Sequence, residues 1–134
     1  MNIFLIIAGL LCFLLGIVHS ILGEYLIFNS KRKKGHLVPS MVNSELKERH
    51  LRILWATWHL VSVFGFCFGI ILIYIALLRS EVNTGIIHLL IKSIASAMFM
   101  SALLVLVGTK GKHPGWIILL VVTILIIIGN GQTI

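Results

Sequence analysis

The chain alternates between four long apolar stretches and three short polar connections. The apolar stretches cover about residues 3–24, 53–78, 85–107 and 116–132. About 20 consecutive apolar residues in a helix cross the hydrocarbon core of a bilayer. The pattern therefore predicts an all-α fold in one domain, an integral membrane bundle of four transmembrane helices.

A polar segment directly before the second stretch also has the pattern of a helix. Asn43 or Ser44 can cap it, which places Glu45 and Glu48 in the first turn, near the positive end of the helix dipole. Nothing interrupts the pattern between this segment and the apolar stretch. We therefore expect a helix extension over residues 44–52 that projects from the membrane.

Charge indicates how the bundle is oriented. Charged residues make up only 11% of the chain, against about a quarter in soluble domains. The net charge of +7 is concentrated in the first connection, where seven basic and two acidic residues sum to +5, and in the third, with Lys110 and Lys112. The positive-inside rule places both connections and the 44–52 extension in the cytoplasm, with the N and C termini outside. Anionic lipid headgroups, rather than nucleic acid, are the expected partners of the basic residues.

Small residues indicate where the helices pack. Gly9, Gly16 and Gly23 recur every seven residues on one face of the first span. Ser93, Ala97 and Ser101 form a similar stripe on the third span. Small side chains allow helix backbones to approach closely in a membrane, so we expect the glycine face of the first span to be a packing seam.

Polar residues on the second span point to a possible site. Residues 45, 48, 52, 55, 59 and 62 fall within one third of the helix circumference at 100° per residue. This polar stripe runs from the cytoplasm into the membrane and reaches His59. Ionisable residues inside a membrane are by default candidates for function.

Antiparallel packing would bring further polar side chains to the depth of His59. Imidazole and carboxylate groups together suit zinc, copper or iron, and helical bundles often hold such ions between facing side chains. We predict a transition-metal site with redox or hydrolytic chemistry at the cytoplasmic end. Its expected ligands are His19, Glu24, Glu48, His59 and His113. Arg52 would balance the carboxylates or bind an anionic substrate or cofactor.

Several alternatives remain open for these residues. His19 and His59 could ligate one haem iron, although closely packed glycine-rich helices leave little room for a porphyrin. The acidic residues could pair with Arg49 or Arg52, with His59 only satisfying a buried hydrogen bond. The absence of Asp from the chain excludes a Ser-His-Asp triad.

Two functions without a metal also fit the sequence. The chain could be a non-catalytic membrane module that assembles with itself or a partner through its small-residue seams. It could also be a proton or ion transporter that uses His88 and Lys92, one helical turn apart on the third span. Transport would require a homo-oligomer, because four thin helices barely enclose a channel.

Three segments carry a resemblance to a known group of proteins. They are GIVHSILGE (16–24), LRILWATWH (51–59) and KHPGW (112–116). Along its whole length the chain resembles small bacterial four-span membrane proteins of uncharacterised function. The resemblance implies a multi-pass protein of the bacterial inner membrane. The polar pattern is only loosely similar to that of ferritin-like carboxylate bundles, since it lacks their paired Glu-x-x-His motifs.

Overall fold

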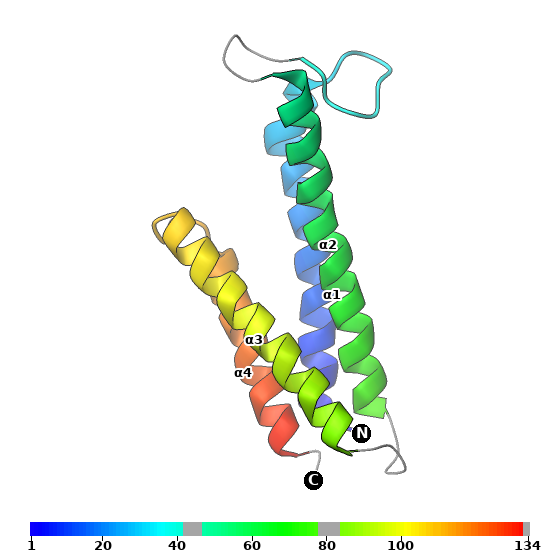
Figure 1. Cartoon of the computed structure of the whole chain (residues 1–134), viewed down its shortest axis with the longest axis vertical. Coiled ribbons are helices and arrows are strands. Elements are labelled where there is room, and N and C mark those ends of the chain that lie inside the picture. The colour runs from blue at the N-terminus through cyan, green and yellow to red at the C-terminus, as the bar shows by residue number, and fades with distance from the viewer. Residues whose placement is uncertain (42–46, 78–83, 133–134) are drawn as a thin grey trace.

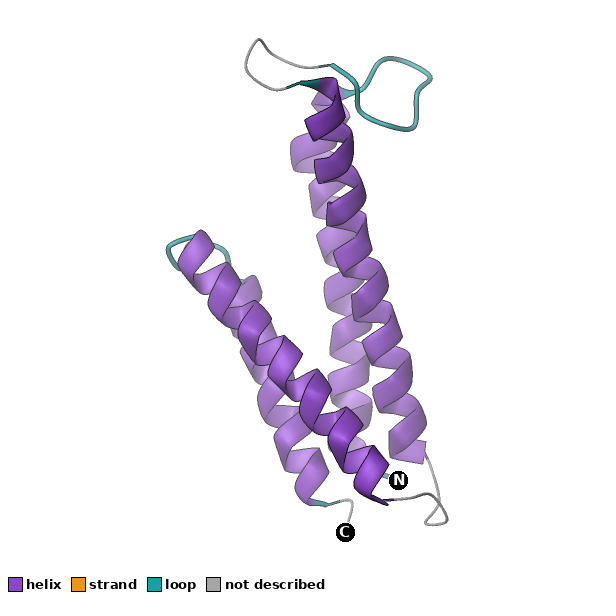
Figure 2. Cartoon of the chain, viewed as in Figure 1, coloured by secondary structure: helices purple, strands orange, loops and turns teal. Residues whose placement is uncertain are grey.

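The chain folds into long helices, as the apolar pattern predicts. The structure, a computed structural model, describes residues 1–41, 47–77 and 84–132 (Figures 1 and 2). A π-helical turn η1 and a 3-10 turn η2 extend the first long helix. In chain order the elements are α1 (Ile3–Gly23), η1 (Glu24–Phe28), η2 (Asn29–Lys31), α2 (Glu48–Leu77), α3 (Thr84–Gly108) and α4 (Gly115–Gly131). The all-α prediction is confirmed for the described residues.

Three of these helices, α1, α2 and α3, are long and apolar enough to cross a membrane. The fourth, α4, is equally apolar in character but has only 17 residues. At 1.5 Å per residue it rises about 26 Å, slightly less than the hydrocarbon core of about 30 Å.

The start of α2 differs from the expected extension over residues 44–52. The helix begins at Glu48, because the carbonyl of Lys47 accepts the backbone N–H groups of His50 and Leu51 at 2.9 and 3.3 Å. Residues 48–52 of the expected extension are therefore helical. The expected caps Asn43 and Ser44 lie outside the described residues, as does Glu45.

The helices form two antiparallel pairs that diverge (Figure 1). One pair is α1 with α2 and the other is α3 with α4, and α1 packs on α4 to join them, whereas α2 and α3 barely touch. We call the end where both termini lie the terminal end, and the opposite end of the α1–α2 pair the loop end. The pairs meet at the terminal end and separate toward the loop end, where α1 and α2 extend beyond α3 and α4.

Asn2 fastens the terminal end. Its backbone N–H donates to the carbonyl of Ala76 on α2 at 3.0 Å, and its side-chain amide donates to the carbonyl of Gly129 on α4 at 2.7 Å. Its amide oxygen caps α1 by accepting the N–H of Leu5 at 3.3 Å. One buried residue therefore holds three helices together.

The serine-containing stripe on α3 lies mostly away from the other described helices. Ser93 is exposed and Ala97 and Ser101 are half-buried. A different set of apolar side chains forms the buried face, and α3 packs mainly on α4. The buried residues of α3 are Ile91, Ile94, Ala95, Met98 and Ala102.

The predicted glycine seam of α1 is confirmed. A Cβ atom at Gly9 would lie 2.8 Å from the carbonyl oxygen of Gly69 on α2, and one at Gly69 would lie 2.9 Å from that of Gly9. Gly16 faces the ring of Phe66 in the same way, and Gly23 faces the indole of Trp58. The absence of these side chains lets the backbones of α1 and α2 approach each other.

We expect Gly9→Ala to lower the free energy of unfolding by about 1–3 kcal/mol, because the new methyl group would force apart two backbones that cannot both yield. Thermal unfolding in detergent, followed by far-ultraviolet circular dichroism, measures the change. Gly108→Ala is the matched control, since a Cβ atom there meets nothing within 4 Å. Equal unfolding temperatures for the two variants would contradict the seam.

Candidate functional site

A carboxylate held by three donor side chains lies near the loop end of the α1–α2 pair. Glu24 begins η1, and its Oε1 accepts the indole N–H of Trp55 at 2.6 Å and lies 2.9 Å from Nε2 of His59. Its Oε2 accepts a guanidinium N–H of Arg32 at 2.6 Å. Both oxygens of Glu24 are therefore engaged by side chains of this chain.

His59 connects this carboxylate to a hydroxyl group. Its Nδ1 lies 3.0 Å from Oγ of Ser20, which in turn lies 2.9 Å from Oγ of the buried Ser62. With Nε2–H donating to Glu24, the Nδ1 of His59 is an acceptor, so the single proton of the Ser20 hydroxyl can be donated either to Nδ1 or, as the structure has it, to Oγ of Ser62. A continuous hydrogen-bonded chain thus runs from hydroxyl to imidazole to carboxylate.

Helical spacing places these groups opposite one another. Ser20 and Glu24 are four residues apart on α1 and η1, and Trp55 and His59 are four apart on α2, so each pair lies on one helix face. Gly23 lies between the first pair and admits Trp58 from α2. The two faces meet because the helices are close there.

Glu24 also begins a π-helical turn. The N–H of Asn29 bonds to the carbonyl of Glu24, five residues back. Single π-helical turns occur frequently at functional sites, where they redirect side chains. Here the turn ends on Phe28, which is fully buried, with its ring edge-on to Trp58 at a centroid distance of 6.0 Å.

Two of the five predicted metal ligands are brought together. Glu24 and His59 are in contact, as described above. The ring of His19 instead stacks on Trp58 at a centroid distance of 4.4 Å and 6° between planes, and the indole N–H of Trp58 donates to the carbonyl of His19 at 3.0 Å. His19 therefore packs beside the site as an aromatic ring.

The other two predicted ligands have local partners elsewhere. His113 lies exposed in the turn before α4, where its Nδ1 accepts the N–H of Gly115 at 3.0 Å. Glu48 forms an ion pair of 2.5 Å with Arg52, one turn along α2. The sequence analysis had offered this pairing as the alternative to metal binding.

No group of three or more His, Cys, Asp or Glu side chains among the described residues could hold a metal ion. The predicted five-ligand centre is therefore not supported. A haem ligated by His19 and His59 has equally little geometric support, because the first ring stacks on an indole and both nitrogens of the second have partners.

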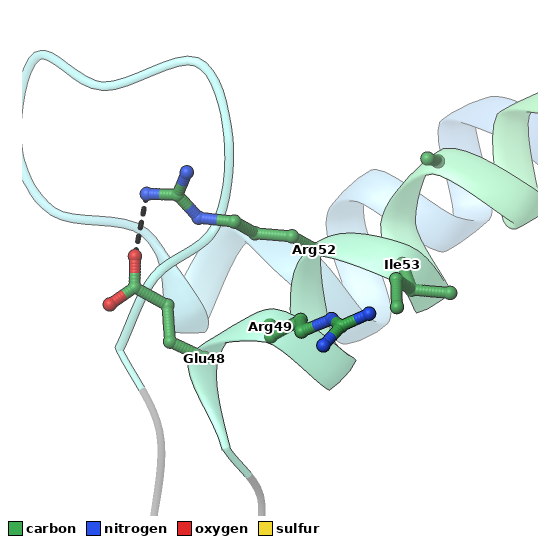
Figure 3. A pocket seen from close by; sticks show the side chains of 5 residues that line it. Glu48, Arg49, Arg52 and Ile53 are labelled. Atoms are coloured by element: carbon green, nitrogen blue, oxygen red, sulfur yellow. Dashed lines mark ion pairs between the residues drawn. The ribbon is translucent and has the colours of Figure 1, made fainter.

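The surroundings of Arg52 form a hollow of about 590 Å³ at the start of α2 (Figure 3). Figure 3 shows Arg52 reaching back to Glu48, while Arg49 extends on the side of Ile53. This hollow contains an ion pair and a second arginine but no His, Ser or Cys among its lining residues, Glu48, Arg49, Arg52, Ile53 and Ala56.

The predicted transport residues lie on α3, nearer the terminal end than the loop end. Nδ1 of His88 lies 2.6 Å from the amide oxygen of Asn130 on α4, so this histidine links the two helices. Lys92 is exposed on the outer surface of α3. Their role in transport stays a prediction.

Ser20 and Arg32 are residues of this cluster that the sequence pattern does not predict, and it predicts Trp55 and Ser62 only as part of a polar stripe. The absence of Asp excludes a Ser-His-Asp triad, but a different carboxylate, that of Glu24, contacts His59 at Nε2, while Ser20 contacts Nδ1. The sequence does contain a signal for this cluster: Ser20 and Glu24 are four residues apart in the first helix, and Trp55 and His59 are four apart in the second. Recognising it required the pairing of α1 with α2 at the correct register.

Comparison with known proteins assigns no function to this arrangement. No family model, curated protein or solved structure matches the chain.

We expect Glu24→Gln to lower the free energy of unfolding by about 1–3 kcal/mol, because an uncharged amide cannot satisfy the Arg32, Trp55 and His59 donors together. Glu48→Gln is the control: its ion pair with Arg52 is about half exposed and should contribute 0.5 kcal/mol or less. Chemical denaturation in detergent measures both. A larger loss for Glu48→Gln would contradict the central position of Glu24.

Proposed function

We propose that the chain is a multi-pass membrane protein with a hydrolytic centre on its α1–α2 pair. The observation that carries the proposal is the hydrogen-bonded series of Ser20, His59 and Glu24. In this series Ser20 is the nucleophile, His59 the general base and Glu24 the carboxylate that orients the imidazole. Such sites are recognised by the roles of their groups and their geometry, and Glu serves in place of Asp in known variants.

The proposed membrane topology has α4 as a fourth span and both termini outside. The bonds of Asn2 to α2 and α4 support termini on one side. The basic residues 31–34 support a cytoplasmic loop end, by the positive-inside rule. The hydrolytic centre then lies at the cytoplasmic surface of the membrane, which the resemblance to bacterial proteins makes the inner membrane.

The chemistry follows from the two nitrogens of His59. The hydroxyl of Ser20 transfers its proton to Nδ1 as Oγ forms a bond to the carbonyl carbon of an ester. The ester C–O bond then breaks, and the leaving alcohol takes the proton from Nδ1. Water then attacks the acyl-serine. It transfers a proton to Nδ1 as it bonds to the carbonyl carbon, and Oγ of Ser20 takes that proton back as the acid leaves. Throughout, Glu24 accepts Nε2–H and stabilises the imidazolium that forms transiently.

The donors around Glu24 favour an orienting role for this carboxylate. Arg32, Trp55 and His59 together engage three of the roughly four lone-pair sites of the Glu24 carboxylate, which holds it in a fixed orientation toward His59. Asn29 and Arg32 line the cleft beside Ser20, and they are the donor side chains that could stabilise a developing oxyanion.

A fluorophosphonate probe should label Ser20 in detergent-solubilised protein, because the probe reacts with activated serine hydroxyls. Peptide mass spectrometry identifies the modified residue. We expect Ser20→Ala to abolish labelling at this peptide and His59→Gln to lower its rate at least 100-fold, the usual minimum contribution of a general base. Ser93→Ala, which removes an exposed hydroxyl on α3, should leave labelling unchanged.

Equal labelling of the wild type and His59→Gln would overturn the proposal, since Ser20 would then react without its base. No labelling of the wild type by several probes of different chain length would do the same.

The transition-metal function predicted from the sequence is a separate proposal, and the contact between His59 and Glu24 is the part of its ligand set that supports it. Elemental analysis after exposure to zinc, copper and iron tests it. The metal proposal expects about one ion per chain in the wild type and none in His59→Ala. The hydrolytic proposal expects equal, substoichiometric metal in both.

A further inference from the structure

Ser20, Glu24 and Arg32 line a cleft of about 400 Å³ at the loop end of α1, together with Ile21, Tyr25 and Asn29. The lining is mixed. Ile21 and Tyr25 offer apolar surface and are 60% and 76% exposed, whereas the others offer a hydroxyl, an amide and an ion pair. A cleft with one apolar and one charged side matches a ligand that is itself amphiphilic.

The arginine in this cleft has an unused donor. Its terminal NH2 group bonds to Glu24, but its Nε is buried and has no hydrogen-bond partner among the described residues. Burying a guanidinium N–H without an acceptor costs free energy, and such groups in native structures call for an explanation. The Arg32 side chain as a whole is 22% exposed, and guanidinium groups bind phosphate through parallel N–H donors, so an anionic oxygen in the cleft is its natural acceptor.

The depth of the cleft selects a lipid. From Ile3 to Gly23, α1 rises about 31 Å, which is one hydrocarbon thickness. Ser20 then lies just inside the edge of the hydrocarbon core, where the ester groups of lipids are found. The guanidinium of Arg32 bonds to Glu24, about one helical turn or 5.4 Å farther out, toward the headgroups. A glycerophospholipid has its ester and phosphate groups in this order.

The surrounding charge favours an anionic headgroup. Arg32 is followed by two exposed lysines, Lys33 and Lys34, and preceded by Lys31. The negative charge of Glu24 lies near these four positive charges, but it is already paired with Arg32. The three lysine charges therefore remain to attract an anion. Clusters of basic residues at the cytoplasmic surface attract anionic lipids and the attraction decays within a Debye length.

We infer that this cleft binds a phosphate-bearing lipid, with the phosphate on Arg32 and an ester carbonyl beside Ser20. The inference names the substrate class of the hydrolytic centre and so rests on the proposed function. The binding itself requires no turnover, and it can be measured in a protein that lacks the nucleophile.

The experiment uses full-length Ser20→Ala protein in detergent and titrates it with short-chain phosphatidylglycerol, with diacylglycerol of the same acyl chains and with inorganic phosphate. Native mass spectrometry reports the bound fraction. We expect saturable 1:1 binding of phosphatidylglycerol, at least 10-fold tighter than that of diacylglycerol. Inorganic phosphate should not compete at equal concentration.

Two further substitutions in the same background test the assignment to Arg32. Arg32→Lys keeps a positive charge for Glu24 but removes Nε–H and the planar donors, and it should weaken binding at least 10-fold. Arg49→Gln is the control, because it removes one charge at the other hollow and should change binding less than twofold (Figure 3).

Distinct outcomes would overturn the inference. Unchanged binding by Arg32→Lys, or equal weakening by both substitutions, would show that Arg32 does not hold the phosphate. Tight competition by inorganic phosphate would show an anion site without lipid selectivity. Phosphatidylglycerol binding without fluorophosphonate labelling would support the lipid site and reject the hydrolytic centre, whereas labelling without binding would reject only this substrate class.

Discussion

The close approach of α1 and α2 is the constraint on which the rest of the molecule depends. It exists because glycines meet along the seam: Gly9 and Gly69 face each other backbone to backbone, and Gly23 admits an indole. Lipid tails are as apolar as the helix surfaces, so burial of apolar side chains alone would not hold the helices together. Backbone packing and interhelical hydrogen bonds provide the specificity, and only at this separation can Ser20 on α1 reach His59 on α2.

Glu24 shows how a carboxylate is accommodated between two apolar helices. An unpaired, partly buried charge in this position would be costly, and the chain surrounds it with an arginine, an indole N–H and an imidazole. These contacts have two consequences. They bind α1 to α2 at the loop end, and they orient His59 so that its second nitrogen meets a hydroxyl. Glu24 therefore both stabilises the helix pair and orients His59, the proposed general base.

The two helix pairs have different tasks in this arrangement. The candidate site is built from α1, its π and 3-10 extensions, and α2, whereas α3 packs mainly on α4, which in turn packs on α1. Asn2 and the contact of His88 with Asn130 secure the terminal end. Because the pairs separate toward the loop end, the α3–α4 turn supplies no ligand to the site, and His113 instead satisfies its own helix start.

The sequence by itself determined the helices and the face on which α1 packs. Apolar length, the glycines at seven-residue spacing and the polar stripe of α2 are local properties, and each follows from the periodicity of a helix. The boundaries of α1, α3 and α4 agree with the expected ones within one residue. The small residues of α3 lie mostly away from the other described helices, and their expected role in assembly with a second copy or a partner stays a prediction.

Only the tertiary structure decided which polar groups share a site. The expectation that three histidines would gather assumed a parallel-sided bundle, in which equal depth means proximity. Divergence of the helix pairs removed His113 from the site, and stacking on Trp58 turned the ring of His19 to a packing role. Arg32 reaches Glu24 from just beyond the π-helical and 3-10 turns, where the backbone becomes extended. Such contacts depend on the rotation and register of one helix against another, which no single stretch of sequence specifies.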